Sequence, residues 1–130
     1  MRTEYIDVYG YWGVIVCYDY DMNDWDDIWS ICRSFGMPDA KAREAIRVLE
    51  QPNTGMAVSN DDIRMSAVFI SDATSASEFY STAIHEMIHV ADAILDYYGT
   101  AWDGEPSAYL VGYLTKELVE MVGEPCEKRR

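Results

Sequence analysis

The sequence lacks several features that mark common classes of protein. Its 130 residues contain only three cysteines, Cys17, Cys32 and Cys126, which are far apart and odd in number. This excludes a framework of disulfide bonds and a CxxC metal site, so we expect reduced thiols. No apolar run approaches the about 18 residues that a membrane span needs, and the N-terminus lacks the pattern of a signal peptide. We therefore expect a cytoplasmic protein that does not associate with membranes.

Positive charge is also scarce. The 10 lysines and arginines are outnumbered by 23 aspartates and glutamates, which gives a formal net charge of −13. A nucleic-acid partner requires a basic face, so this balance argues against one. An acidic surface usually serves solubility, and a preference for basic peptides is the sharper interpretation. Because no linker or repeat divides the chain, we expect one domain over residues 1–130.

The pattern of apolar residues predicts both strands and helices. Residues 3–18 are rich in Tyr, Val and Ile and are interrupted by two glycines, so they are expected to form one bent strand or two short strands. Helical spacing predicts helices over residues 24–35 and 38–50. Residues 55–59 and 65–71 are expected to form a hairpin around a turn at residues 60–62.

Two further helices are expected in the C-terminal half. The first covers residues 77–98, with Ser75 and Glu78 in a capping box and Gly99 at its end. The second begins at Glu105-Pro106 and ends near residue 122. On a helical wheel the first helix is apolar over most of its circumference and has one polar stripe. The stripe consists of Glu78, Ser81, Thr82, His85, His89, Asp92 and Asp96.

The stripe contains an HExxH motif at residues 85–89. Residues four apart on a helix are about 40° apart around its axis, so His85 and His89 face one point, and two neutral imidazoles suit zinc. Glu86 lies about 100° round from His85, where it can reach a water on the metal as a general base. These are the only two histidines in the chain, which argues against a chance occurrence of the motif.

A catalytic zinc site needs a third protein ligand and leaves a fourth position for water. Glu105 is the main candidate, because it begins the next helix, where Ala108 and Gly112 would let the two helices approach closely. Asp103 is the second candidate. Asp92, on the stripe, is a candidate acceptor for the N–H of a ligand imidazole. An ordinary solvated acid remains the alternative interpretation for each of these residues.

The HExxH helix with its glycine end, followed by Glu105 at the start of a helix, resembles the gluzincin branch of the zincin metallopeptidases. Residues 105–114 also resemble small metallopeptidase-like proteins encoded by phages and prophages. The resemblance covers mainly residues 55–122. It implies a minimal zincin-like α+β fold, in which a small three-stranded sheet packs on the HExxH helix and on the glutamate-bearing helix. It also implies that the strand at residues 65–70 is the sheet edge along which an extended peptide lies.

By the same resemblance, His85, His89 and Glu105 hold Zn²⁺, and Glu86 activates the zinc-bound water that hydrolyses a peptide bond. Two departures are visible: the spacing from His89 to Glu105 is shorter than in thermolysin-like enzymes, and no downstream histidine is present to stabilise the transition state. Tyr109, about 40° from Glu105 on the helix, is one candidate to replace that histidine. The alternative functions are a non-catalytic zinc-binding assembly or regulatory domain and a metal-free helical interaction module.

Overall fold

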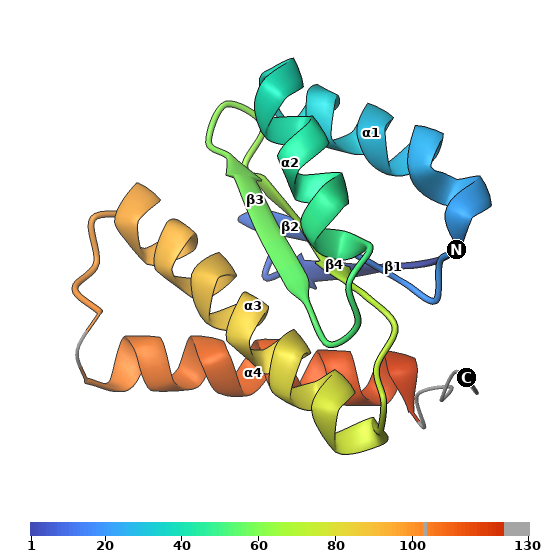
Figure 1. Ribbon diagram of the computed structural model, residues 1–130. Coiled ribbons are helices and arrows are strands. Elements are labelled where there is room, and N and C mark those ends of the chain that lie inside the picture. The colour runs from blue at the N-terminus through green and yellow to red at the C-terminus, as the bar shows by residue number, and fades with distance from the viewer. Residues whose placement is uncertain (103, 124–130) are drawn as a thin grey trace.

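The computed structural model describes residues 1–102 and 104–123, which form a four-stranded sheet with two helices on each face (Figure 1). The α+β class expected from the sequence is confirmed, and the helices end close to their predicted limits. In chain order the elements are β1 (Arg2–Val8), β2 (Trp12–Tyr18), the 3-10 turn η1 (Met22–Asp24), α1 (Trp25–Ser34), α2 (Asp39–Leu49), β3 (Gly55–Asn60), β4 (Met65–Ile70), α3 (Ala76–Tyr97) and α4 (Glu105–Val122).

The sheet has the strand order β1-β2-β4-β3, so the prediction of three strands is wrong. The N-terminal segment forms two antiparallel strands because Tyr9 and Gly10 adopt left-handed backbone conformations, with φ of 53° and 74°. Two successive residues with positive φ make a tight turn that matches the twist of a hairpin. The carboxylate of Asp7 accepts a hydrogen bond from the Gly10 N–H and helps to fix that turn.

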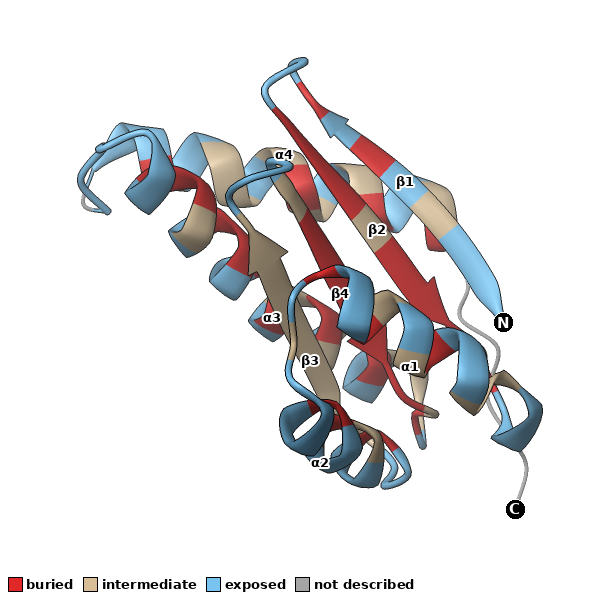
Figure 2. Cartoon of the chain, turned by 90° about the horizontal axis from the view of Figure 1, so that it is seen from above, coloured by how far each residue is buried: buried red, intermediate tan, exposed pale blue. Residues whose placement is uncertain are grey.

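The strand at residues 65–70 is also not the sheet edge that the family resemblance implied. β4 lies between β2, to which it is parallel, and β3, to which it is antiparallel, so β3 is the edge strand on that side (Figure 2). The residues of β4 explain the difference, since nearly all of them are buried, as an interior strand covered on both faces requires. Every residue of β3 is half-buried instead.

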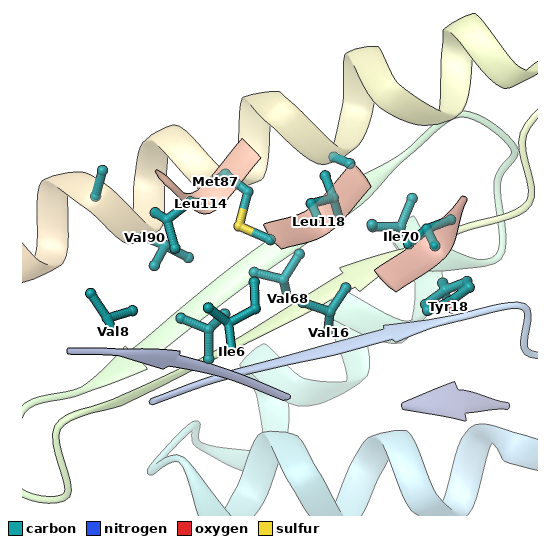
Figure 3. Packing of buried hydrophobic residues seen from close by; sticks show 14 of the residues in the cluster. Ile6, Val8, Val16, Tyr18, Val68, Ile70, Met87, Val90, Leu114 and Leu118 are labelled. Carbon is teal, nitrogen blue, oxygen red and sulfur yellow. The ribbon is translucent and has the colours of Figure 1, made fainter. Parts of the chain in front are cut away.

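Alternating side chains of β2 and β4 divide the core into two clusters. Val16 and Val68 face α3 and α4, whereas Cys17 and Phe69 face α1 and α2. Figure 3 shows the first cluster, which fills the space between the sheet and the two C-terminal helices. Its helical members include Ala83, Met87 and Val90 of α3 and Leu114, Leu118 and Val122 of α4.

α3 begins and ends where the sequence predicts. The Ser75 hydroxyl accepts a hydrogen bond from the Glu78 N–H at 3.1 Å, which caps the first turn. At the other end Gly99 has a φ of 68°, and the Thr100 N–H donates to the Leu95 carbonyl at 2.8 Å. This is a glycine-based helix end that leaves the chain free to turn back. Among the described residues, no helix has the length and apolar character needed to cross a membrane.

α4 runs back along α3 in the opposite direction (Figure 1). At one end the Tyr80 hydroxyl of α3 donates to the Gly123 carbonyl. Near the other end Ile94 of α3 and Leu110 of α4 line the same apolar hollow. The Tyr113 hydroxyl donates to the Asp7 carbonyl at 2.6 Å and ties α4 to β1. These contacts fix the register of the two helices, which decides where Glu105 lies.

Candidate functional site

The HExxH motif lies in the middle of α3, on the side of the helix that neither the sheet nor α4 covers. Six members of the polar stripe are exposed and Thr82 is half-buried, so the predicted stripe is confirmed. The open arc of the helix is wider than predicted, because Ile88 is also 42% exposed. His85 and His89 therefore face open space rather than the protein interior.

The two imidazoles lie close to one another. Their ring centroids are 5.0 Å apart and their planes are inclined by 73°. One helical turn separates their backbones, as the motif requires. The His85 side chain is 68% exposed, so its ring nitrogens are accessible from solvent. This arrangement suits two imidazoles that bind one ion.

Glu86 is placed differently from the histidines, because it points under the start of β3. It is only 7% exposed. A Cβ atom at Gly55 would lie 2.9 Å from the Glu86 Cγ and 2.8 Å from the Thr82 Cγ2. Gly55 thus lets the edge strand approach α3 closely enough to cover the Glu86 side chain. A side chain at position 55 would force this carboxyl group to move.

The carboxyl group of Glu86 has few partners for a buried acid. Its Oε2 lies 3.9 Å from the His85 Nε2, and no described residue donates a hydrogen bond to it. Burial raises the pKa of Glu86 above its usual range, and the two nearby histidines partly oppose that rise. A buried carboxyl group with a raised pKa, next to two imidazoles, is the pattern expected of a general base.

A groove of about 410 Å³ runs beside the motif. One wall is the N-terminal half of α3, and the other is the end of α2 with the segment that leads into β3. Hydrogen bonds hold this second wall: the Thr54 hydroxyl bonds the Val48 and Gln51 carbonyls, and the Asn53 side chain bonds Thr74. The lining residues are Val48, Asn53, Thr54, Gly55, Glu78, Ser81, Thr82, His85 and Glu86.

The structure does not bring Glu105 to the histidines. It is the first residue of α4, which starts apart from the last turn of α3 (Figure 1). Tyr97 ends α3 eight residues after His89, which corresponds to about 12 Å along the helix axis. The described part of the chain contains no group of three or more His, Cys, Asp or Glu residues that could hold a metal ion.

The small residues of α4 do not serve the purpose that the sequence suggested. A Cβ atom added at Gly112 would meet nothing within 4 Å, so this glycine faces solvent rather than α3. Ala108 is exposed as well. The prediction that these two residues allow a close approach of the helices is wrong, because α4 packs through its leucine face instead.

Among the described residues, Asp92 and Tyr109 make no hydrogen bond or ion pair with the motif. Asp103 lies outside the described residues. Asp92 is exposed on the polar stripe, and no hydrogen bond joins it to His89 among the described residues. Tyr109 is 74% exposed on the outer side of α4. The roles predicted for Asp92, Tyr109 and Glu105 stay predictions.

Sequence reasoning missed the far wall of the groove. Gly55, Asn53 and Thr54 border the motif although they precede it by about thirty residues in sequence. Gly55, at the first position of a predicted strand, was the available signal, because a glycine in a strand often marks a place where the backbone closely approaches another element. Comparison of the chain with protein-family models, with curated proteins and with solved structures finds no match.

Proposed function

We propose that the chain is a zinc-dependent peptidase in which His85 and His89 bind the metal and Glu86 is the general base. The observation that carries the proposal is the nearly buried Glu86 side chain, whose carboxyl group lies 3.9 Å from the His85 Nε2 and lines the same groove as His85. Removing a carboxylate from most of its water costs free energy, and the two histidines offset only part of that cost. Such a group is expected where a protein uses it for chemistry.

The described residues supply only part of the set of ligands that a zinc site needs. Two neighbouring imidazoles on one helical face are ligands that zinc prefers. Among the described residues no third candidate joins them in a group that could hold a metal ion, so the proposal assigns the metal to the two histidines and Glu105 stays a prediction. Zinc bound there would polarise a peptide carbonyl and lower the pKa of a bound water toward about 7.

Glu86 would move the proton in this reaction. Its raised pKa brings the carboxyl group closer to the neutral range, where an acid can both accept and return a proton. It would take the proton from the attacking water and deliver it to the nitrogen of the departing amine. Gly55 holds this carboxyl group in place by allowing β3 to cover it.

The open edge of β3 supports a peptide as the substrate. β3 pairs with β4 on one side only, so backbone N–H and C=O groups on its other side can pair with an added strand. The first residue of β3, Gly55, lines the groove together with His85 and Glu86. A peptide added to this edge would thus place its backbone beside the motif, in a zincin-like arrangement.

The proposal is tested by incubating zinc-loaded protein with a mixture of peptides and identifying new termini by mass spectrometry. We expect cleavage by the wild type, no cleavage by Glu86→Gln with its zinc retained, and normal cleavage by the control Glu120→Gln. Glu120 is an exposed acid of α4 away from the groove. Cleavage by Glu86→Gln at the wild-type rate would remove Glu86 from the mechanism.

A non-catalytic zinc-binding assembly or regulatory domain is the second candidate. It is favoured by the donor set, because among the described residues no group of three His, Cys, Asp or Glu residues that could hold a metal ion includes the pair His85 and His89. The same experiment separates the two candidates. Zinc binding with no cleavage of any peptide in the mixture would support the non-catalytic domain and contradict the peptidase.

A further inference from the structure

The polar stripe of α3 carries unpaired negative charge on both sides of the two histidines. Glu78 precedes them, Asp92 and Asp96 follow them, and all three side chains are exposed. Among the described residues, no lysine or arginine forms an ion pair with any of the three. Residues 74–122 contain eight acids and a single base, Lys116. The segment that contains the motif therefore carries a strong net negative charge.

The groove beside the motif has the same charge. Glu78 and Glu86 are its charged acids, and no lysine or arginine lines it. Arg47 adjoins the lining residue Val48 in α2, but its guanidinium pairs with Glu44 at 3.4 Å. A ligand in this groove would meet carboxylates on α3 and no opposing positive charge from the lining residues.

Glu86 gives a second indication that the ligand is positively charged, and it is independent of the exposed acids. It is more than nine-tenths buried, it lines the groove, and no described residue donates a hydrogen bond to its carboxyl group. A buried carboxylate is stabilised by a cation or a donor supplied from outside. The His85 imidazole lies 3.9 Å from this carboxyl group, and no lysine or arginine lines the groove to neutralise its acids.

The geometry of β3 and α3 defines how a ligand would meet these charges. The two elements run in the same general direction in both views, with β3 beside the helix (Figures 1 and 2). A peptide paired with the free edge of β3 would consequently extend along the polar stripe. Glu78 and Asp96 are each nine residues from Met87, or about 13 Å along the axis. An extended peptide covers that distance in about four residues.

We infer that this groove binds an extended basic peptide, with Glu78 recognising lysine or arginine on one side of the histidines and Asp92 and Asp96 recognising it on the other. The preferred basic residues lie within about four positions of the peptide bond nearest the histidines. The inference rests on the proposed function for the place where the peptide lies, but it does not require cleavage. Glu78, Asp92 and Asp96 act as specificity-determining residues.

The test measures binding in metal-free protein, in a chelating buffer, so that no turnover is needed. A fluorescein-labelled peptide of about ten residues, with arginines about four positions from its centre, is compared with the same peptide carrying glutamates. We expect fluorescence anisotropy to show at least about tenfold tighter binding of the arginine peptide, a preference that weakens as salt is added.

Two matched triple variants separate the effect of the stripe acids on peptide binding from the effect of the net charge of the protein. Glu78→Gln/Asp92→Asn/Asp96→Asn should weaken binding of the arginine peptide about tenfold, because three charge pairs are lost. The control Asp27→Asn/Asp62→Asn/Glu120→Gln removes the same net charge from exposed positions that do not line the groove, and should change binding less than about twofold.

Equal weakening by the two triple variants, or no preference for arginine over glutamate, would overturn the inference. Failure of this inference can be distinguished from failure of the proposed function. Selective binding with no cleavage by the zinc-loaded protein would leave the basic-peptide site standing and remove the peptidase. Cleavage that ignores the charge of the peptide would support the peptidase and remove the basic-peptide site.

Discussion

The outer sides of α3 and α4 differ in what lies next to them, although both helices carry acids there. Beside α3, the start of β3 approaches so closely at Gly55 that a Cβ atom there would touch Thr82 and Glu86. Beside α4, a Cβ atom at Gly112 would meet nothing within 4 Å. The comparison teaches that a second element packed against a helix, rather than the acids of the helix alone, turns an acidic side chain into a candidate catalytic group.

Of the substitutions considered, removal of a histidine from α3 should have the largest effect, which is a loss of zinc affinity. His89→Ala leaves one imidazole where two now lie 5.0 Å apart, and we expect zinc affinity to fall by at least about a hundredfold. Isothermal titration calorimetry on metal-free protein measures this loss. Unchanged affinity in both His89→Ala and His85→Ala would show that zinc binds elsewhere.

The two glycines should respond in opposite directions to the same substitution. Gly55→Ala places a methyl group 3.1 Å from the Phe69 carbonyl as well as against α3, so we expect a loss of about 1–3 kcal/mol in the free energy of unfolding. Gly112→Ala should gain up to about 1 kcal/mol, because alanine is the better residue in an open helix position. Urea denaturation compares the two variants, and equal effects would contradict the close approach of β3.

Glu86→Gln should stabilise the metal-free protein by about 1 kcal/mol at neutral pH, whereas Glu120→Gln should have little effect. Burial raises the pKa of Glu86 in the folded state, so the folded protein binds this proton more tightly than the unfolded chain. The cost of the charge is consequently present at neutral pH and disappears as pH falls below the ordinary value of 4.5.

Thermal unfolding followed by circular dichroism at several pH values measures this difference. The advantage of Glu86→Gln should shrink steadily from pH 7 toward the acid end of the stable range. A variant that is less stable than the wild type at neutral pH would indicate that the Glu86 carboxylate has a stabilising partner.

Glu105 on α4 should give the smallest effect on the metal. Because Glu105 joins the two histidines in no group that could hold a metal ion among the described residues, we expect Glu105→Gln to change zinc affinity less than about twofold. Its loss from the first turn of α4 should cost about 0.3–1 kcal/mol of stability through the helix dipole. A tenfold loss of zinc affinity would instead support the sequence-based prediction that Glu105 is the third ligand.

The helices and strands could be predicted because their signals are local. The capping serine of α3, the glycine at its end and the spacing of its polar stripe all act within a few residues. The sheet order could not be predicted, because it depends on which strands pair across long separations. β4 was expected at the edge, yet its two apolar faces, with Val68 on one and Phe69 on the other, place it inside.

The candidate site also has a local part that the sequence predicts and a long-range part that it does not. One helical turn fixes the spacing of His85 and His89, so their proximity follows from the motif alone. The position of Glu105 depends instead on the connection that precedes α4 and on the leucine face that packs this helix against the core. The cover over Glu86 comes from Gly55, whose partner lies thirty-one residues further along the chain.

Nuclear magnetic resonance of the imidazole nitrogens tests the central assignment most directly, because the chain has only two histidines. The spectrum of uniformly ¹⁵N-labelled, metal-free protein should contain two sets of ring signals, from His85 and His89. On addition of zinc we expect both sets to shift together and to stop shifting at one equivalent of metal. A shift of one ring only, or of neither at one equivalent, would contradict a metal centre built on this pair.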